Sequence, residues 1–74
     1  MDNPDTYQVR IALLQDEKNI EIVLDHAERR LGIKPNAAFY RSDTTAPDLS
    51  KWGIKLISLE DNYPYNVIGL FHRD

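Results

Sequence analysis

The 74-residue sequence contains no cysteine, which removes two common ways of stabilising a small domain. Without thiols, neither a disulfide framework nor a thiolate zinc site can form. A chain of this length buries only about 60–65% of the surface that its unfolded form exposes, so its core is small. We therefore expect one domain, residues 1–74, stabilised by side-chain packing alone or by packing together with self-association.

Glycine is also scarce, with three residues that stand apart from one another. Neither GxGxxG nor GxxxxGK[ST] occurs, which excludes both kinds of phosphate-cradling loop. The GxSxG and HExxH motifs are missing as well. His26 and His72 have no neighbour at metal-ligand spacing, and the adjacent helix positions Asp25 and His26 do not face each other. The sequence therefore predicts no catalytic, cofactor-binding or metal-binding residues, and no enzyme activity.

The chain lacks long hydrophobic runs and has no excess of basic charge. Its 12 acidic residues outnumber 9 lysines and arginines, for a net charge of −3, which disfavours nucleic-acid binding without excluding it. No stretch approaches the roughly 20 apolar residues that span a bilayer. The acidic beginning, MDNPDTYQ, has no apolar region of the signal-peptide type. We therefore predict a cytoplasmic protein that does not associate with membranes.

The first apolar stretch, TYQVRIALLQ, alternates as a half-buried strand does. Residues 1–5, which precede it, are interpreted as a flexible leader. The opposite face of the strand would carry Gln8 and Arg10. The inward face would carry Tyr7, Val9, Ile11 and Leu13.

The next segment, DEKNIEIVLDHAERRLG, changes to the spacing of an α-helix. Asp16 suits the N-cap, and Gly32 suits the position that follows the last turn. These residues predict a helix of about four turns over Glu17–Leu31. Its apolar side is formed by Ile20, Val23, Leu24, Ala27 and Leu31.

The remaining stretches predict a short strand at Ala37–Arg41, a polar connection over 42–52, and two final strands in WGIKLISLE and YNVIGLFHR. An antiparallel hairpin is the simplest way to join the final two strands. The predicted fold class is α+β: a small, mostly antiparallel three- or four-stranded sheet packed by one main α-helix, in β-α-β-β-β order.

Both final strands carry apolar residues on both faces, which is typical of strands buried on both sides. One helix covers only one face of a small sheet. Three covers for the second face remain open. They are the 42–52 connection through Leu49 and Trp52, a second copy of the chain, and another protein.

Five residues are candidate partner-binding residues. Tyr63 and Tyr65 flank Pro64, and tyrosine is enriched at interfaces because it combines a large rigid ring with a polar tip. We expect Tyr63 to project towards a partner. Tyr65 is in phase with Val67 and Phe71, so we expect it to be mainly structural, beside Trp52. The other three, on the helix side opposite the core, form a mixed contact patch: Ile22, His26 and Arg29.

These patterns favour a small standalone protein-binding regulator or inhibitor that occludes a partner surface, and that forms a homodimer. One alternative is a nucleic-acid-associated protein with a local basic patch. That patch would consist of Arg10, Lys51, Lys55 and Arg73. A second alternative is a metal-independent ribonuclease, whose acid, base and cation would come from residues near strand ends. Those residues are Tyr40, Arg41, His72 and Arg73.

Overall fold

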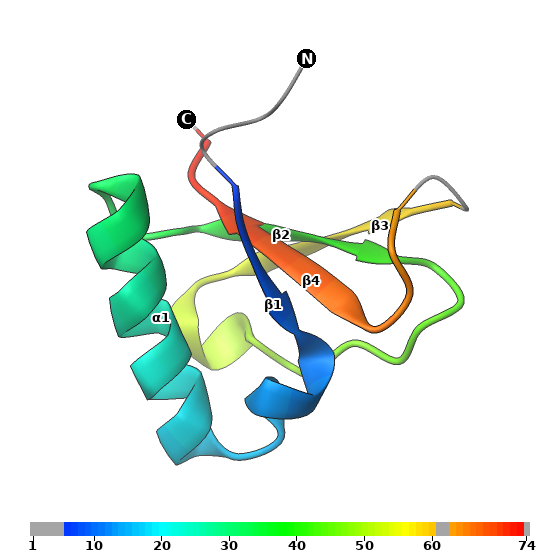
Figure 1. Cartoon of the computed structure of the whole chain (residues 1–74), viewed down its shortest axis with the longest axis horizontal. Helices are drawn as coiled ribbons and strands as arrows, with labels where there is room; N and C mark the ends of the chain where they lie inside the picture. Colours follow the sequence, from blue (N-terminus) through cyan, green and yellow to red (C-terminus); the bar gives the residue numbers. More distant parts are fainter. Residues whose placement is uncertain (1–5, 61–62, 74) are drawn as a thin grey trace.

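The computed structural model describes residues 6–60 and 63–73, so the predicted leader, residues 1–5, lies outside the described residues. The predicted α+β class, with one main helix, a mostly antiparallel sheet and β-α-β-β-β order, is confirmed (Figure 1). The strands are β1 (Tyr7–Arg10), β2 (Ala37–Arg41), β3 (Lys55–Leu59) and β4 (Val67–Phe71). The helices are α1 (Glu17–Leu31) and two short 3-10 helices, η1 (Ile11–Leu14) and η2 (Ser50–Trp52).

The bounds of α1 are those that its capping residues predict. The Asp16 carboxylate accepts a hydrogen bond from the Asn19 N–H at 2.9 Å and so satisfies a donor in the first turn. At the other end, Gly32 adopts a φ of 78°, and its N–H donates to the Glu28 carbonyl at 2.8 Å. In the described part of the chain, no helix combines the length and the apolar character that crossing a membrane requires.

The first strand is shorter than its alternation predicts. β1 ends at Arg10, and η1 follows it, which turns the chain towards α1. In a 3-10 helix, residues three positions apart lie on the same side, so Ile11 and Leu14 both face the core. The prediction that Leu13 points inward is wrong, because its exposed fraction is 49% and that of Leu14 is 2%.

The predicted hairpin of the last two strands is also wrong. The strand order is β1-β4-β2-β3, in which β4 pairs antiparallel with both β1 and β2, and β3 pairs parallel with β2 (Figure 1). Composition agrees with the central position of β4, although the other central strand, β2, ends with the charged Arg41. β4 has no charged residue and is largely buried, as suits a central strand, whereas β1 and β3 carry Arg10 and Lys55 at the edges of the sheet.

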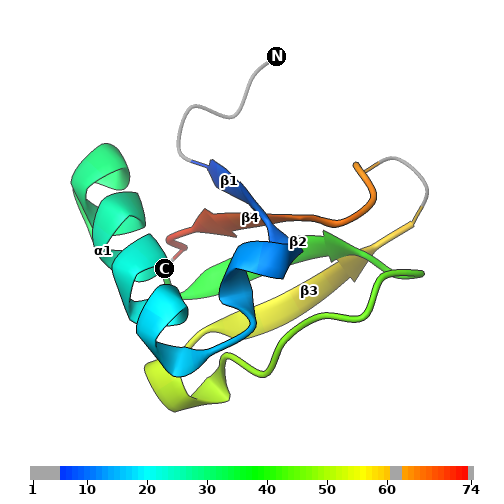
Figure 2. The same ribbon diagram turned by 60° about the horizontal axis from the view of Figure 1, so that its bottom comes forward.

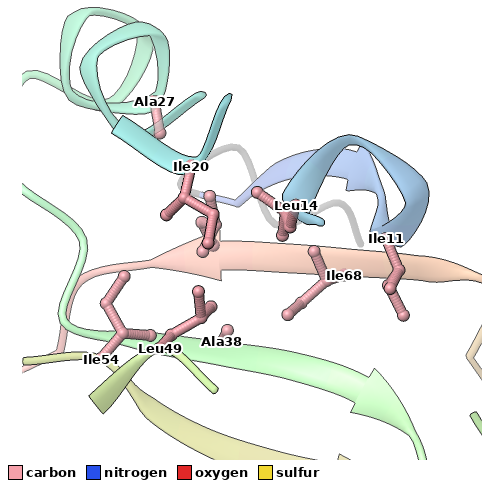
Figure 3. Close-up of a cluster of buried hydrophobic side chains, with 9 residues drawn as sticks. Ile11, Leu14, Ile20, Ala27, Ala38, Leu49, Ile54 and Ile68 are labelled. Atoms are coloured by element: carbon pink, nitrogen blue, oxygen red, sulfur yellow. The ribbon is translucent and has the colours of Figure 1, made fainter. Parts of the chain in front are cut away.

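The core lies between α1 and one face of the sheet, and the 42–52 connection closes it from the side of β3. Figure 3 shows the buried side chains that meet there, among them Ile20 from α1, Leu14 from η1 and Ile68 from β4. Leu49 is fully buried in this same cluster, and Trp52 packs against it. Figure 2 shows η2 next to the first turn of α1. The connection therefore covers the helix side of the sheet, and of the three covers that the sequence left open for the second face, Leu49 and Trp52 of this connection do not provide one.

Candidate protein-binding surfaces

The second face of the sheet is covered by no helix in the described residues, and we call it the helix-free face. Strand register places Gln8, Gly69, Phe39 and Ile57 in one row across the four strands on this face. The Phe39 and Phe71 rings stack there, with their centroids 4.4 Å apart and their planes 13° apart. The apolar side chains of the face, half-buried except for the buried Ala37 and Phe71, are Ala37, Phe39, Ile57, Leu59, Val67 and Phe71.

Tyr63 folds back over this face. A Cβ atom built on Gly69 would collide with the Tyr63 hydroxyl and would lie 2.8 Å from Thr6 Cγ2, so glycine at this position permits the close approach of the ring. The ring centroid lies 6.4 Å from that of Phe39, and the Gln8 amide donates to the Tyr63 hydroxyl at 3.4 Å. Tyr63 lies against the sheet rather than projecting from it, and its role as a partner contact stays a prediction.

Tyr65 is exposed, with an exposed fraction of 56%. Asn66 adopts a φ of 62°, which interrupts the strand alternation, so Tyr65 is out of phase with Val67. The Arg41 guanidinium carbon lies 5.8 Å from the centre of the Tyr65 ring, within reach of a cation–π interaction. The expectation that Tyr65 is mainly structural beside Trp52 is therefore wrong, whereas its assignment as a partner contact stays a prediction.

Burial against the sheet raises the pKa of the Tyr63 phenol above the ordinary tyrosine value of 10.0, and the hydrogen bond from Gln8 opposes part of this rise. The folded state therefore favours the protonated phenol, which stabilises the domain below pH 10 and is lost as the pH rises through the higher pKa. We expect thermal melts across alkaline pH to show a smaller loss of stability for Tyr63→Phe than for the unsubstituted protein. An equal alkaline loss in both proteins would contradict this assignment.

The predicted helix patch is only partly assembled. Ile22 and His26 line a groove of about 270 Å³ between α1 and β1, and the exposed fraction of Ile22 is 53%. Arg29 does not line this groove and instead forms an ion pair with Asp25, in which Arg29 Nε lies 3.3 Å from Asp25 Oδ2. The exposed Leu13 also lines the groove, and the sequence analysis missed it because it placed this leucine in the core.

The four cations of the nucleic-acid alternative are spread over the molecule. Arg10 lies at the end of the sheet where β1 and β2 finish, and Lys55 lies at the opposite end, where β3 begins. Arg73 follows β4 at that same opposite end. Lys51 pairs with Glu17 beside the start of α1, at 2.8 Å. Electrostatic attraction to a phosphate backbone is strongest over a continuous basic stripe, and these four side chains form none.

The four residues of the ribonuclease alternative fall into two pairs. Tyr40 and Arg41 finish β2, whereas His72 and Arg73 follow β4, which runs antiparallel to β2. The pairs therefore lie towards opposite ends of the sheet: Tyr40 lies opposite Ile68, which is four residues before His72, or about 13 Å at roughly 3.3 Å per residue. Acid–base catalysis requires groups within hydrogen-bond reach of one substrate atom, and this arrangement does not bring the two pairs together.

Compared with known protein families, with curated proteins and with solved structures, the chain matches none of them.

Proposed function

We propose that the protein is a small protein-binding regulator or inhibitor, which covers a surface of its partner with the helix-free face. The observation that carries this proposal is the set of neighbouring half-buried apolar side chains on that face, which α1 and η2 do not cover and Tyr63 covers in part. Apolar surface of this kind on a small domain is a common mark of a protein interface. The lack of cysteine is compatible with action in the reducing cytoplasm.

The mechanism is occlusion by a preformed surface. Strands pair on both sides of β2 and β4, so the centre of the face is ordered before a partner arrives and little conformational entropy is lost on binding. Phe39 and Tyr63 supply aromatic contact area near the middle, as in the energetically dominant parts of known interfaces. Arg41 and Lys55 stand at the rim, where charged side chains favour correct orientation.

The proposal is tested by placing one charge on the helix-free face. Val67 is half-buried on β4, two strands away from the edge strand β3, and Val67→Lys introduces an ammonium group into the apolar surface. The control is Ile33→Lys, because Ile33 follows α1 and its exposed fraction is 46%. Each immobilised variant captures proteins from an extract of the native host, and mass spectrometry identifies what is bound.

We expect Val67→Lys to lose the specific partner, with a loss of affinity of about tenfold or more for a contact worth about 1.4 kcal/mol or more. Ile33→Lys should retain the partner. Thermal melts of both variants establish that they remain folded. The proposal is rejected if folded Val67→Lys captures the same partner as strongly as Ile33→Lys does.

A further inference from the structure

The strand β3 has a free hydrogen-bonding edge. Its alternate residues face β2: the Lys55 N–H donates to the Asn36 carbonyl at 3.0 Å, and the Leu59 carbonyl accepts from the Ser42 N–H at 2.6 Å. In a parallel ladder the intervening residues, Leu56 and Ser58, direct their backbone N–H and C=O groups away from β2, towards the open edge. Within the described residues, no backbone hydrogen bond from a loop or turn uses those groups of Leu56 and Ser58.

This edge lacks most of the features that keep edge strands from pairing. β3 contains no proline, and half-buried apolar side chains stand on both of its faces. Leu56 packs against the core on the helix side, whereas Ile57 and Leu59 belong to the helix-free face. A strand of this composition is well suited to accept another strand on its outer side.

The charges at the two ends of β3 favour one direction of self-pairing over the other. Lys55 stands at its beginning, and Glu60 follows its end. A parallel arrangement of two copies would place like charges side by side, whereas an antiparallel arrangement brings each lysine towards the glutamate end of the other copy. In the register with a twofold axis at Ile57, Lys55 lies opposite Leu59 and not Glu60, so the attraction acts between the ends of the two strands rather than within one cross-strand pair.

One register satisfies the outward groups without using residues beyond β3. With a twofold axis at Ile57, Leu56 of each copy lies opposite Ser58 of the other, and both residues direct their hydrogen-bonding groups outward. A twofold axis at Leu56 would instead require the N–H of Ile54, which already donates to the Leu49 carbonyl at 3.3 Å. A twofold axis at Ser58 would leave Lys55 without a partner inside the strand, because β3 ends at Leu59.

We propose that β3 pairs antiparallel with β3 of a second copy, with the two Ile57 residues opposite each other. The dimer then has one continuous eight-stranded sheet, because each copy contributes four strands. The two helix-free faces join along the new pair, which doubles the apolar surface offered to a partner. This inference rests on the proposed function, because the joined face is the surface with which the protein occludes its partner.

Cysteine substitution tests the register directly, because the chain has no cysteine of its own. The paired Ile57 residues form a non-hydrogen-bonded pair, whose Cα atoms lie about 4.5 Å apart, within the range of about 4.4–6.8 Å that a disulfide spans. We expect mild oxidation to cross-link Ile57→Cys into a dimer. The control Ile33→Cys reacts only through collisions, so at tens of micromolar it should be roughly tenfold slower or more, since pairing raises the effective concentration to about millimolar.

Ser58→Cys checks the register, because in the proposed pairing it lies opposite Leu56 of the other copy. It should cross-link more slowly than Ile57→Cys. Faster cross-linking of Ser58→Cys than of Ile57→Cys overturns the proposal, and so does equal cross-linking of Ile57→Cys and Ile33→Cys. Gel electrophoresis without reducing agent, read over time, distinguishes these outcomes.

The oligomeric state provides an independent test. Size-exclusion chromatography with light scattering should show a dimer of the unsubstituted protein at tens of micromolar. Ser58→Pro removes an outward N–H that the β2–β3 ladder does not use, so it should give a folded monomer. A monomeric unsubstituted protein, or a Ser58→Pro variant that stays dimeric, overturns the proposal.

Val67→Lys separates this inference from the proposed function, because Val67 lies two strands from the β3 edge. If β3 pairs with β3 of a second copy, Val67→Lys remains a homodimer although it no longer binds the protein partner. If the edge pairing is wrong and the proposed function is right, the unsubstituted protein is monomeric and Val67→Lys still loses the partner.

Discussion

Leu14→Ala is expected to lower the free energy of unfolding by about 2–5 kcal/mol, whereas Leu13→Ala should lower it by less than about 1 kcal/mol. The two leucines are neighbours in the chain, but their exposed fractions are 2% and 49%. Truncating Leu14 leaves a cavity among the buried side chains of the core, while truncating Leu13 removes contacts only at the surface groove. Urea denaturation of both variants measures the difference.

A loss of this size is comparable to the whole stability of many small domains, so Leu14→Ala is expected to be largely unfolded. Leu14→Met keeps the comparison measurable, because it nearly conserves volume and should cost less than about 1.5 kcal/mol. A larger loss for Leu13→Ala than for Leu14→Ala would contradict η1, because a strand that continued through Leu13 would point Leu13 inward and Leu14 outward.

Gly69→Ala is expected to destabilise the domain by about 1–3 kcal/mol, as overpacking of a close contact does. The added methyl group would meet the Tyr63 hydroxyl and would lie 2.8 Å from Thr6 Cγ2. Because the hydroxyl is the tip of a side chain, the ring can swing away, but it then loses its contact with Phe39 and its hydrogen bond from Gln8. Chemical denaturation measures the cost.

The Tyr63→Phe background separates the contribution of the hydroxyl. Without the hydroxyl, the nearest atom of the ring to the new methyl group is Cζ at 3.4 Å, which is an ordinary contact distance. A double-mutant cycle should therefore give a smaller cost for Gly69→Ala in Tyr63→Phe than in the unsubstituted protein. Additive costs in the cycle would mean that the Tyr63 ring does not lie over Gly69.

Local chemistry made α1 predictable from the sequence. Its start depends on Asp16 and a donor three residues away, and its end depends on the freedom of Gly32 to adopt a positive φ. The pairing of β4 was not predictable in this way, because it depends on which distant strands compete for the same edge. The lack of charge in β4 was a signal for its central position, but an incomplete one, because β2 is also central and carries Arg41.

The candidate surfaces also divide into residues that local sequence spacing predicts and residues whose placement depends on contacts elsewhere. Ile22 and His26 were found from helical spacing alone, because an α-helix relates sequence distance to surface position regularly. The placement of Tyr63 depends on its approach to Gly69, and the exposure of Tyr65 depends on the backbone of Asn66. Glycine inside a strand is a signal for close approach of another group, but it does not identify which group approaches.

The central position of β4 has a consequence for synthesis of the protein. Tyr7 pairs with Leu70, so the first and last strands of the described chain are neighbours, and β1 has no strand partner until β4 has left the ribosome. The α1 segment is free to gain helical structure earlier, because its hydrogen bonds are local. Contacts between distant parts of a chain slow folding, and the complete sheet forms only after translation of β4, because β4 joins β1 to the β2–β3 pair. In a nascent chain stalled before Val67, β1 has no strand partner and β2 has one unpaired edge, so we expect such a chain to be recognised by chaperones and proteases.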